Sequence, residues 1–171
     1  MMLRSFFWML GILFVILILQ TTVLTYVSLW AVTPNLLLLL FVILSIQNGS
    51  IPALICGFII GIPIDILAGN PVGYHSLLLT IFGYIFGLGK GKIFFDPLFI
   101  PAMMSLVVTF FYTVGLFLIS TLFNLSKPFA SFFNTSFMIE LAYNVVAAPI
   151  LYFVYNFIRQ KMQNSRRGFD G

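Results

Sequence analysis

Few residues of this chain could do chemistry, and two of them lie close together. Asp65 sits in an otherwise uncharged apolar run, and His75, the single histidine, follows after a short turn. A further acid, Glu140, stands near the start of a late apolar run. No serine or cysteine lies in a context that would activate it as a nucleophile, and one histidine with one cysteine, Cys56, does not make a metal site. We therefore predict no catalytic, cofactor-binding or metal-binding residues and no enzyme.

Asp65 occupies a costly position for a carboxylate. It falls near the C-terminal end of a predicted apolar helix, where the helix macrodipole disfavours an anion. Acids in membrane spans are usually paired, and the N-terminal amides of the next helix offer a positive end across the turn. We predict that Asp65 fastens the turn to that helix; contact with a partner or ligand, and proton or ion handling, are the alternatives. His75 is interpreted as an interfacial residue rather than a ligand.

Small residues surround this acid at helical spacing. The first series is Ala53, Gly57, Gly61 and Asp65, and the second is Gly83 and Gly87, each spaced by four positions and so sharing one helix face. Gly69 is predicted to end the first helix, and Gly73 closes the turn before the second. Small residues let helices approach closely in a membrane. The sequence thus predicts a tight helical hairpin with these residues at its seam.

The composition places the hairpin in a membrane protein. Of 171 residues, 61% are hydrophobic and only 7% are charged, which is typical of membrane-spanning chains. We predict one all-α integral membrane domain over residues 1–171, a polytopic bundle of six transmembrane helices. The expected spans are 6–24, 31–47, 51–68, 73–88, 98–122 and 136–158, followed by a basic, flexible tail over 159–171. Pro34 is expected in the first turn of the second span, and Ser50 is expected to cap the third.

The basic residues predict the orientation. With six spans, one side holds Arg4, Lys90, Lys92, Arg159, Lys161, Arg166 and Arg167, and the other holds only Lys127. The positive-inside rule then places both termini in the cytoplasm and the turn after Asp65 outside. The positive charge therefore indicates orientation and contact with anionic lipid rather than nucleic-acid binding.

The last span carries a second polar face. Glu140, Asn144, Ala147 and Ala148 follow one another at helical spacing. Two interpretations of Glu140 remain open: it belongs to this polar face near the outer side, or it is an interfacial acid that meets lipid headgroups. Lys127 is a candidate partner for its carboxylate.

Several stretches carry a family pattern. They are Pro34-Asn35 with the Leu-rich run after it, Gly57 and Gly61, the run Asp65-Ile66-Leu67-Ala68-Gly69-Asn70-Pro71-Val72-Gly73, Leu77 to Leu79, and Gly83-Tyr84. The run from Asp65 is similar to the pattern D-L-(I/L)-S-G-x-x-x-G, with Ala68 in place of the usual Ser, and Asn144 with Pro149 fits a weaker N-x-x-x-x-P pattern. In these stretches the chain resembles MreD, a family of bacterial rod shape-determining membrane proteins. The first and fifth spans carry no diagnostic motif.

The resemblance implies a non-enzymatic subunit of the machinery for cell elongation and peptidoglycan synthesis in the cytoplasmic membrane. Its implied partners are an MreC-like single-span protein and, more widely, MreB, RodA and a class B penicillin-binding protein. We expect the partner's helix to pack where short spans and glycine faces leave surface that lipid fills poorly, beside Asp65 and Glu140.

The resemblance also implies a fold similar to the substrate-binding subunits of energy-coupling-factor vitamin transporters. Such a transporter subunit is the alternative function. Those subunits commonly carry an Ala-x-x-x-Ala surface on their first helix, whereas the first span here has Gly11 but no such pair.

Overall fold

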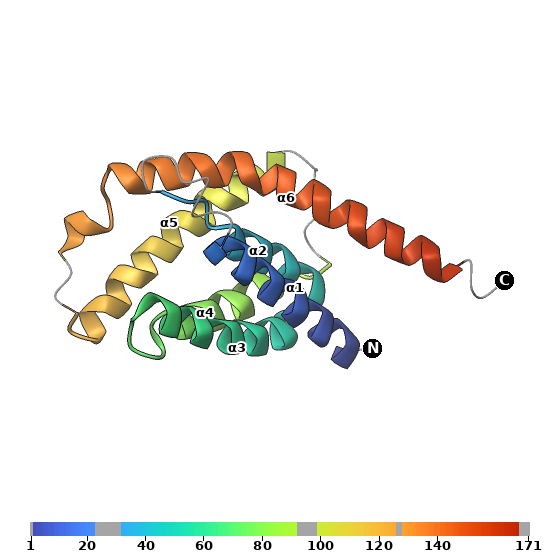
Figure 1. Ribbon diagram of the computed structural model, residues 1–171, viewed down its shortest axis with the longest axis horizontal. Coiled ribbons are helices and arrows are strands. Elements are labelled where there is room, and N and C mark those ends of the chain that lie inside the picture. Colours follow the sequence, from blue (N-terminus) through green and yellow to red (C-terminus); the bar gives the residue numbers. More distant parts are fainter. Residues whose placement is uncertain (1, 23–31, 92–98, 126–127, 168–171) are drawn as a thin grey trace.

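The computed structural model is a bundle of α-helices, and it describes residues 2–22, 32–91, 99–125 and 128–167 (Figure 1). In these ranges the helices are α1 (Met2–Thr22), α2 (Leu36–Asn48), α3 (Ser50–Ala68), α4 (Tyr74–Gly87), α5 (Phe99–Leu122) and α6 (Thr135–Arg167), with a short 3-10 turn, η2 (Phe129–Ser131), before α6. The predicted all-α fold with six helices is confirmed.

The helices differ in their ability to cross a membrane. In the described ranges α3, α5 and α6 with the turn before it are long and apolar enough to do so. By contrast, α2 has 13 residues and α4 has 14. At 1.5 Å per residue each of these rises about 20 Å, which is short of a hydrocarbon core of about 30 Å. The other helices shield α2, whereas α4 keeps an exposed face that includes Ile81 and Ile85.

α2 is the core helix of the bundle. Its residues from Leu37 to Ile46 are all buried, and it contacts each of the other helices. A helix that is hydrophobic all round belongs in the interior, where it needs neither a polar face nor the length to cross a membrane. The purely apolar run of this helix therefore has its explanation in burial within protein rather than in contact with lipid.

α3 and α4 form the predicted hairpin, and its seam excludes side chains. A Cβ atom added at Gly57 would lie 2.5 Å from the carbonyl oxygen of Leu79, and one at Gly83 would lie 2.6 Å from that of Ala53. Added Cβ atoms at Gly61 and Gly87 would collide with the backbone of the opposite helix in the same way. The backbones are in direct contact, so the small residues at these positions are a requirement of packing.

Two helix starts differ from the prediction. α2 begins at Leu36 rather than at 31, because Asn35 is its N-cap and its side chain accepts a hydrogen bond from the Leu38 amide. Pro34 thus precedes the helix instead of occupying its first turn. Ser50 is the first residue of α3 and not its cap; Gly49, with a left-handed φ of 99°, holds the cap position.

The last helix also runs further than predicted. α6 continues to Arg167 instead of ending at 158, so the basic segment is helical up to that residue. No glycine or proline interrupts the chain between Pro149 and Gly168. The expected loop cations Lys92 and Lys127 lie outside the described residues.

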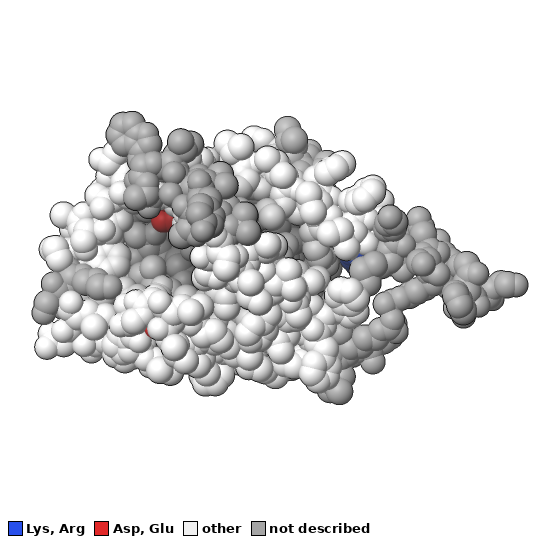
Figure 2. Space-filling model, in the orientation of Figure 1, with Lys and Arg blue, Asp and Glu red and all other residues white. Residues whose placement is uncertain are grey.

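The ends of the molecule are distinct. α1 begins and α6 ends on the right of Figure 1, whereas the turn between α3 and α4 lies at the left. Figure 2 shows that charged side chains hardly interrupt this face of the described surface. An almost uncharged exterior is what contact with lipid requires.

Candidate functional site

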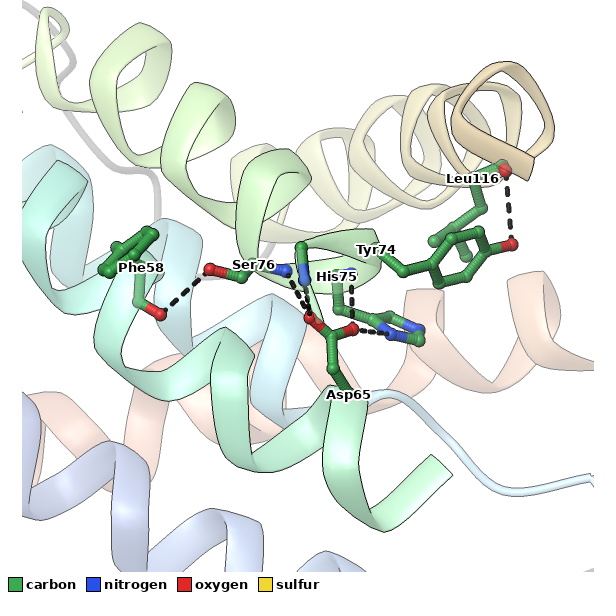
Figure 3. Close-up of polar contacts among 7 residues, drawn as sticks. Phe58, Asp65, Tyr74, His75, Ser76 and Leu116 are labelled. Atoms are coloured by element: carbon green, nitrogen blue, oxygen red, sulfur yellow. Dashed lines mark hydrogen bonds and ion pairs between the residues drawn. The ribbon is translucent and has the colours of Figure 1, made fainter. Parts of the chain in front are cut away.

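Asp65 completes the N-terminus of α4 from across the hairpin (Figure 3). Its side chain is fully buried and accepts hydrogen bonds from the backbone amides of Gly73 at 2.9 Å, His75 at 2.6 Å and Ser76 at 3.3 Å. The first amides of a helix have no partner within that helix, and the positive end of its dipole attracts an anion. The contact predicted between Asp65 and the amides of the next helix is therefore present in the structure.

His75 belongs to the same cluster. Its Nδ1 lies 2.9 Å from Asp65 Oδ1, and its side chain is only 14% exposed. The ring also lies between the rings of Tyr74 and Tyr112, at centroid distances of 4.9 and 6.4 Å. His75 thus packs on the carboxylate of Asp65.

The cluster is not arranged for nucleophilic catalysis, although it contains Ser, His and Asp. Asp65 accepts a hydrogen bond from the backbone amide of Ser76, not from its hydroxyl. The Ser76 hydroxyl donates to the Phe58 carbonyl oxygen at 3.1 Å. The hydroxyl of Tyr74 likewise donates to the Leu116 carbonyl oxygen at 3.2 Å, which ties α4 to α5 (Figure 3). Both hydroxyls are engaged in holding helices together, and no described hydrogen bond joins Ser76 Oγ to the imidazole.

The turn that carries the cluster uses its glycines for their backbone conformation. Gly69 ends α3 in the left-handed region at φ 65°, and Gly73 precedes α4 at φ 110°. A side chain at either position would strain the backbone. Gly73 must also present its amide to Asp65, so its conformation and its hydrogen bond depend on each other.

A second cluster completes the N-terminus of the core helix α2. Asn144 is fully buried. Its Oδ1 accepts a hydrogen bond from the Asn35 backbone amide at 2.9 Å, and its Nδ2 donates one to Thr109 Oγ1 at 2.9 Å. Gln20 Oε1, from α1, accepts a hydrogen bond from the Leu37 backbone amide at 2.9 Å. Glu140, which is half-buried, lies beside the side chain of Asn35. Side chains from α1, α5 and α6 thus meet at one half-buried helix end.

The two clusters follow one physical rule. A helix end inside a membrane protein has no water to satisfy its amides, so protein groups must do so. An acid lies near each N-terminus, Asp65 at α4 and Glu140 at α2. At the opposite end of α2 the cations gather: Lys90 Nζ donates to the Asn48 carbonyl oxygen and Arg159 to Gln47 Oε1, each at 2.9 Å. Acids thus lie at helix N-termini and cations at a helix C-terminus, which is the arrangement that the helix macrodipoles favour.

Sequence reasoning found some members of these clusters and missed others. It singled out Asp65, Glu140 and Asn144, but it did not connect Asn144 with Asn35, and it gave Gln20 no role. The available signal was an isolated polar residue at the edge of an apolar run. Pro149 lies inside α6 and is half-buried. Lys127, the suggested partner of Glu140, lies outside the described residues.

Comparison with known proteins gives one match. A family model described as rod shape-determining protein MreD matches residues 2–161. Neither a curated protein nor a solved structure matches the chain.

Proposed function

The chain belongs to the MreD family of rod shape-determining proteins, and from this premise we propose that it binds and positions an MreC-like single-span partner in the cell-elongation machinery. The family match over residues 2–161 is the observation that carries the proposal. The family is one of multi-pass membrane proteins and not of enzymes. MreB, RodA and a class B penicillin-binding protein are proposed as further members of the assembly.

The partner surface that we propose differs from the one expected from the sequence. The glycine faces of α3 and α4 are occupied by each other, and Asp65 is fully buried. Neither is available to a further helix. An apolar groove of about 640 Å³ between α1 and α6 supports a different location. Its floor is Leu40 of α2, and its walls include Val15 and Val154.

Gly11 is the feature of this groove that favours a helix as its occupant. It lines the groove, and a Cβ atom placed on it would meet nothing within 4 Å. A glycine facing open space in an apolar groove lets the backbone of another helix approach closely, as small residues do at helix–helix contacts in membranes. We propose that the transmembrane helix of the MreC-like partner lies here, with its juxtamembrane segment toward the end that carries Glu140.

Gly11→Leu is expected to reduce partner binding without destabilising the protein. The leucine would fill the groove but contact nothing within the chain, and it favours a helix more than glycine does. Co-purification with the MreC-like partner should fall several-fold while the melting temperature of the protein alone is kept. Ile81→Trp, at a half-exposed position on α4, is the matched control and should keep the partner. Unchanged co-purification by Gly11→Leu would place the partner elsewhere.

The orientation is proposed from the charges. Lys90 and Arg159 lie together at the C-terminal end of α2, and Asp65 lies at the other end of the bundle. This separation favours cytoplasmic termini under the positive-inside rule. Cys56 is buried, so it should give little background in a labelling experiment.

A cysteine replacing Val72, in the exposed turn between α3 and α4, should react with an impermeant thiol reagent added to intact cells, because this turn is proposed to lie outside. A cysteine replacing Lys90 should react only after the membrane is opened. Labelling of the Lys90 position from outside would refute the orientation.

A further inference from the structure

Two adjoining cavities open at the end of the bundle where α2 and α4 begin. Their volumes are about 350 and 440 Å³. They share five lining residues, which are Gln20, Asn35, Thr113, Leu116 and Glu140. The smaller cavity reaches His75 and the end of α3, and the larger one reaches η2 and the start of α6. We name the two adjoining cavities together the end cavity; the larger half is mainly polar and the smaller half mainly apolar.

The end cavity has the lining of a site for an organic cation. Glu140 is the carboxylate that borders both halves, and no lysine or arginine is among the described lining residues. The rings of Tyr112, Phe132 and Phe137 line the same space. A carboxylate with aromatic faces attracts an ammonium group by charge and by cation–π interaction.

The helix end alone does not require this arrangement. The backbone amides at the N-terminus of α2 and just before it already donate hydrogen bonds to the side chains of Asn35, Asn144 and Gln20. In the described part of the chain no amide at this end of α2 donates to Glu140, and a half-buried carboxylate has lone pairs to offer. The acid therefore has capacity left for a ligand.

The apolar side of the end cavity indicates where the ammonium comes from. Leu17 of α1 and Ile64 and Leu67 of α3 line the smaller half, and Leu67 is 64% exposed on the outside of the bundle. An acyl chain could leave the cavity over these residues, while the Gln20 amide and the Ser136 hydroxyl offer donors to a phosphate ester. We propose that the end cavity binds the headgroup of a membrane lipid that carries a primary ammonium, with Glu140 as the ammonium ligand.

The proposal is tested on the full chain purified in detergent without a partner, so that its failure is separate from failure of the proposed function. Native mass spectrometry would compare retention of phosphatidylethanolamine with that of its N-acetylated form, which has the same acyl chains but no cation. Loss of one charge-assisted contact predicts at least about tenfold weaker retention of the acetylated lipid. Glu140→Gln should abolish the preference. Met138→Gln, at an exposed position on the same helix, should keep it.

Two further measurements make the outcome decisive. Phe132→Leu removes one aromatic ring from the end cavity and leaves Glu140 in place. It should weaken the preference, and it is the deciding variant if Glu140→Gln does not fold. Free ethanolamine at the same concentration tests the source of the ammonium: lipid retained without ethanolamine binding supports the lipid, whereas equal binding assigns the site to a soluble amine and overturns the lipid assignment. Equal retention of the two lipids by the unmodified chain, or an unchanged preference in Glu140→Gln, overturns the proposal.

Discussion

Gly61→Leu is expected to destabilise the protein strongly, with a free energy of unfolding lower by about 3 kcal/mol or more, the upper end of the range for overpacking. Any Cβ atom at this position would collide with the backbone of Ser76, which cannot move aside as a flexible side chain can. The melting temperature of the purified protein in detergent should fall by roughly 10 °C. Gly57→Leu should behave similarly, because its Cβ atom would meet the Leu79 backbone.

Gly11→Leu is the matched control for this result. It makes the same chemical change on another helix, where a Cβ atom meets nothing within 4 Å. Equal loss of melting temperature in Gly11→Leu and Gly61→Leu would show that the effect comes from the leucine itself. A full melting temperature for Gly61→Leu would show that α3 and α4 do not need their close approach.

Asp65→Ala is the second substitution with a large expected effect. It removes the acceptor of the Gly73, His75 and Ser76 amides in a fully buried site. An unsatisfied buried donor costs about 1–3 kcal/mol, so the loss of three should lower the free energy of unfolding by about 3 kcal/mol or more. The melting temperature of the protein alone is the measurement.

Asp65→Asn is the control of nearly equal shape. Asparagine keeps one acceptor oxygen but turns an NH₂ group toward backbone donors. Its melting temperature should therefore lie between those of the parent protein and Asp65→Ala. An Asp65→Ala variant with the melting temperature of the parent protein would show that the carboxylate does not stabilise the hairpin. The control also separates loss of the hydrogen bonds from loss of side-chain volume.

The hairpin and its acid could be predicted from the sequence because their determinants are local. The spacing of Gly57, Gly61 and Asp65 fixes one helix face, and the acceptor and its amides are separated by a single turn. The small residues predict close packing without a structure, and the close packing in turn buries Asp65. Here local pattern and tertiary contact agree.

The cluster at the start of α2 could not be predicted in the same way. The hydrogen bond between Asn35 and Asn144 joins residues 109 positions apart, and no local pattern in a single sequence reports such a pair. The groove beside Gly11 depends equally on how α1 and α6 diverge. The start of α2 was missed for a related reason. Asparagine can occupy either a helical or an N-cap position, and the hydrogen bonds that Asn35 makes in the folded protein determine which one it occupies.

We expect the hairpin around Asp65 to be a self-contained structural unit and the partner to lie on the groove at Gly11. The most direct measurement compares the parent protein, Gly11→Leu and Asp65→Ala for two quantities in the same detergent: the melting temperature without partner, and the amount of MreC-like partner retained per folded molecule. We predict that Gly11→Leu keeps the melting temperature and loses the partner, whereas Asp65→Ala loses melting temperature and keeps the partner per folded molecule. An Asp65→Ala protein that keeps its melting temperature but loses the partner would contradict this expectation and would place Asp65 in contact with the partner.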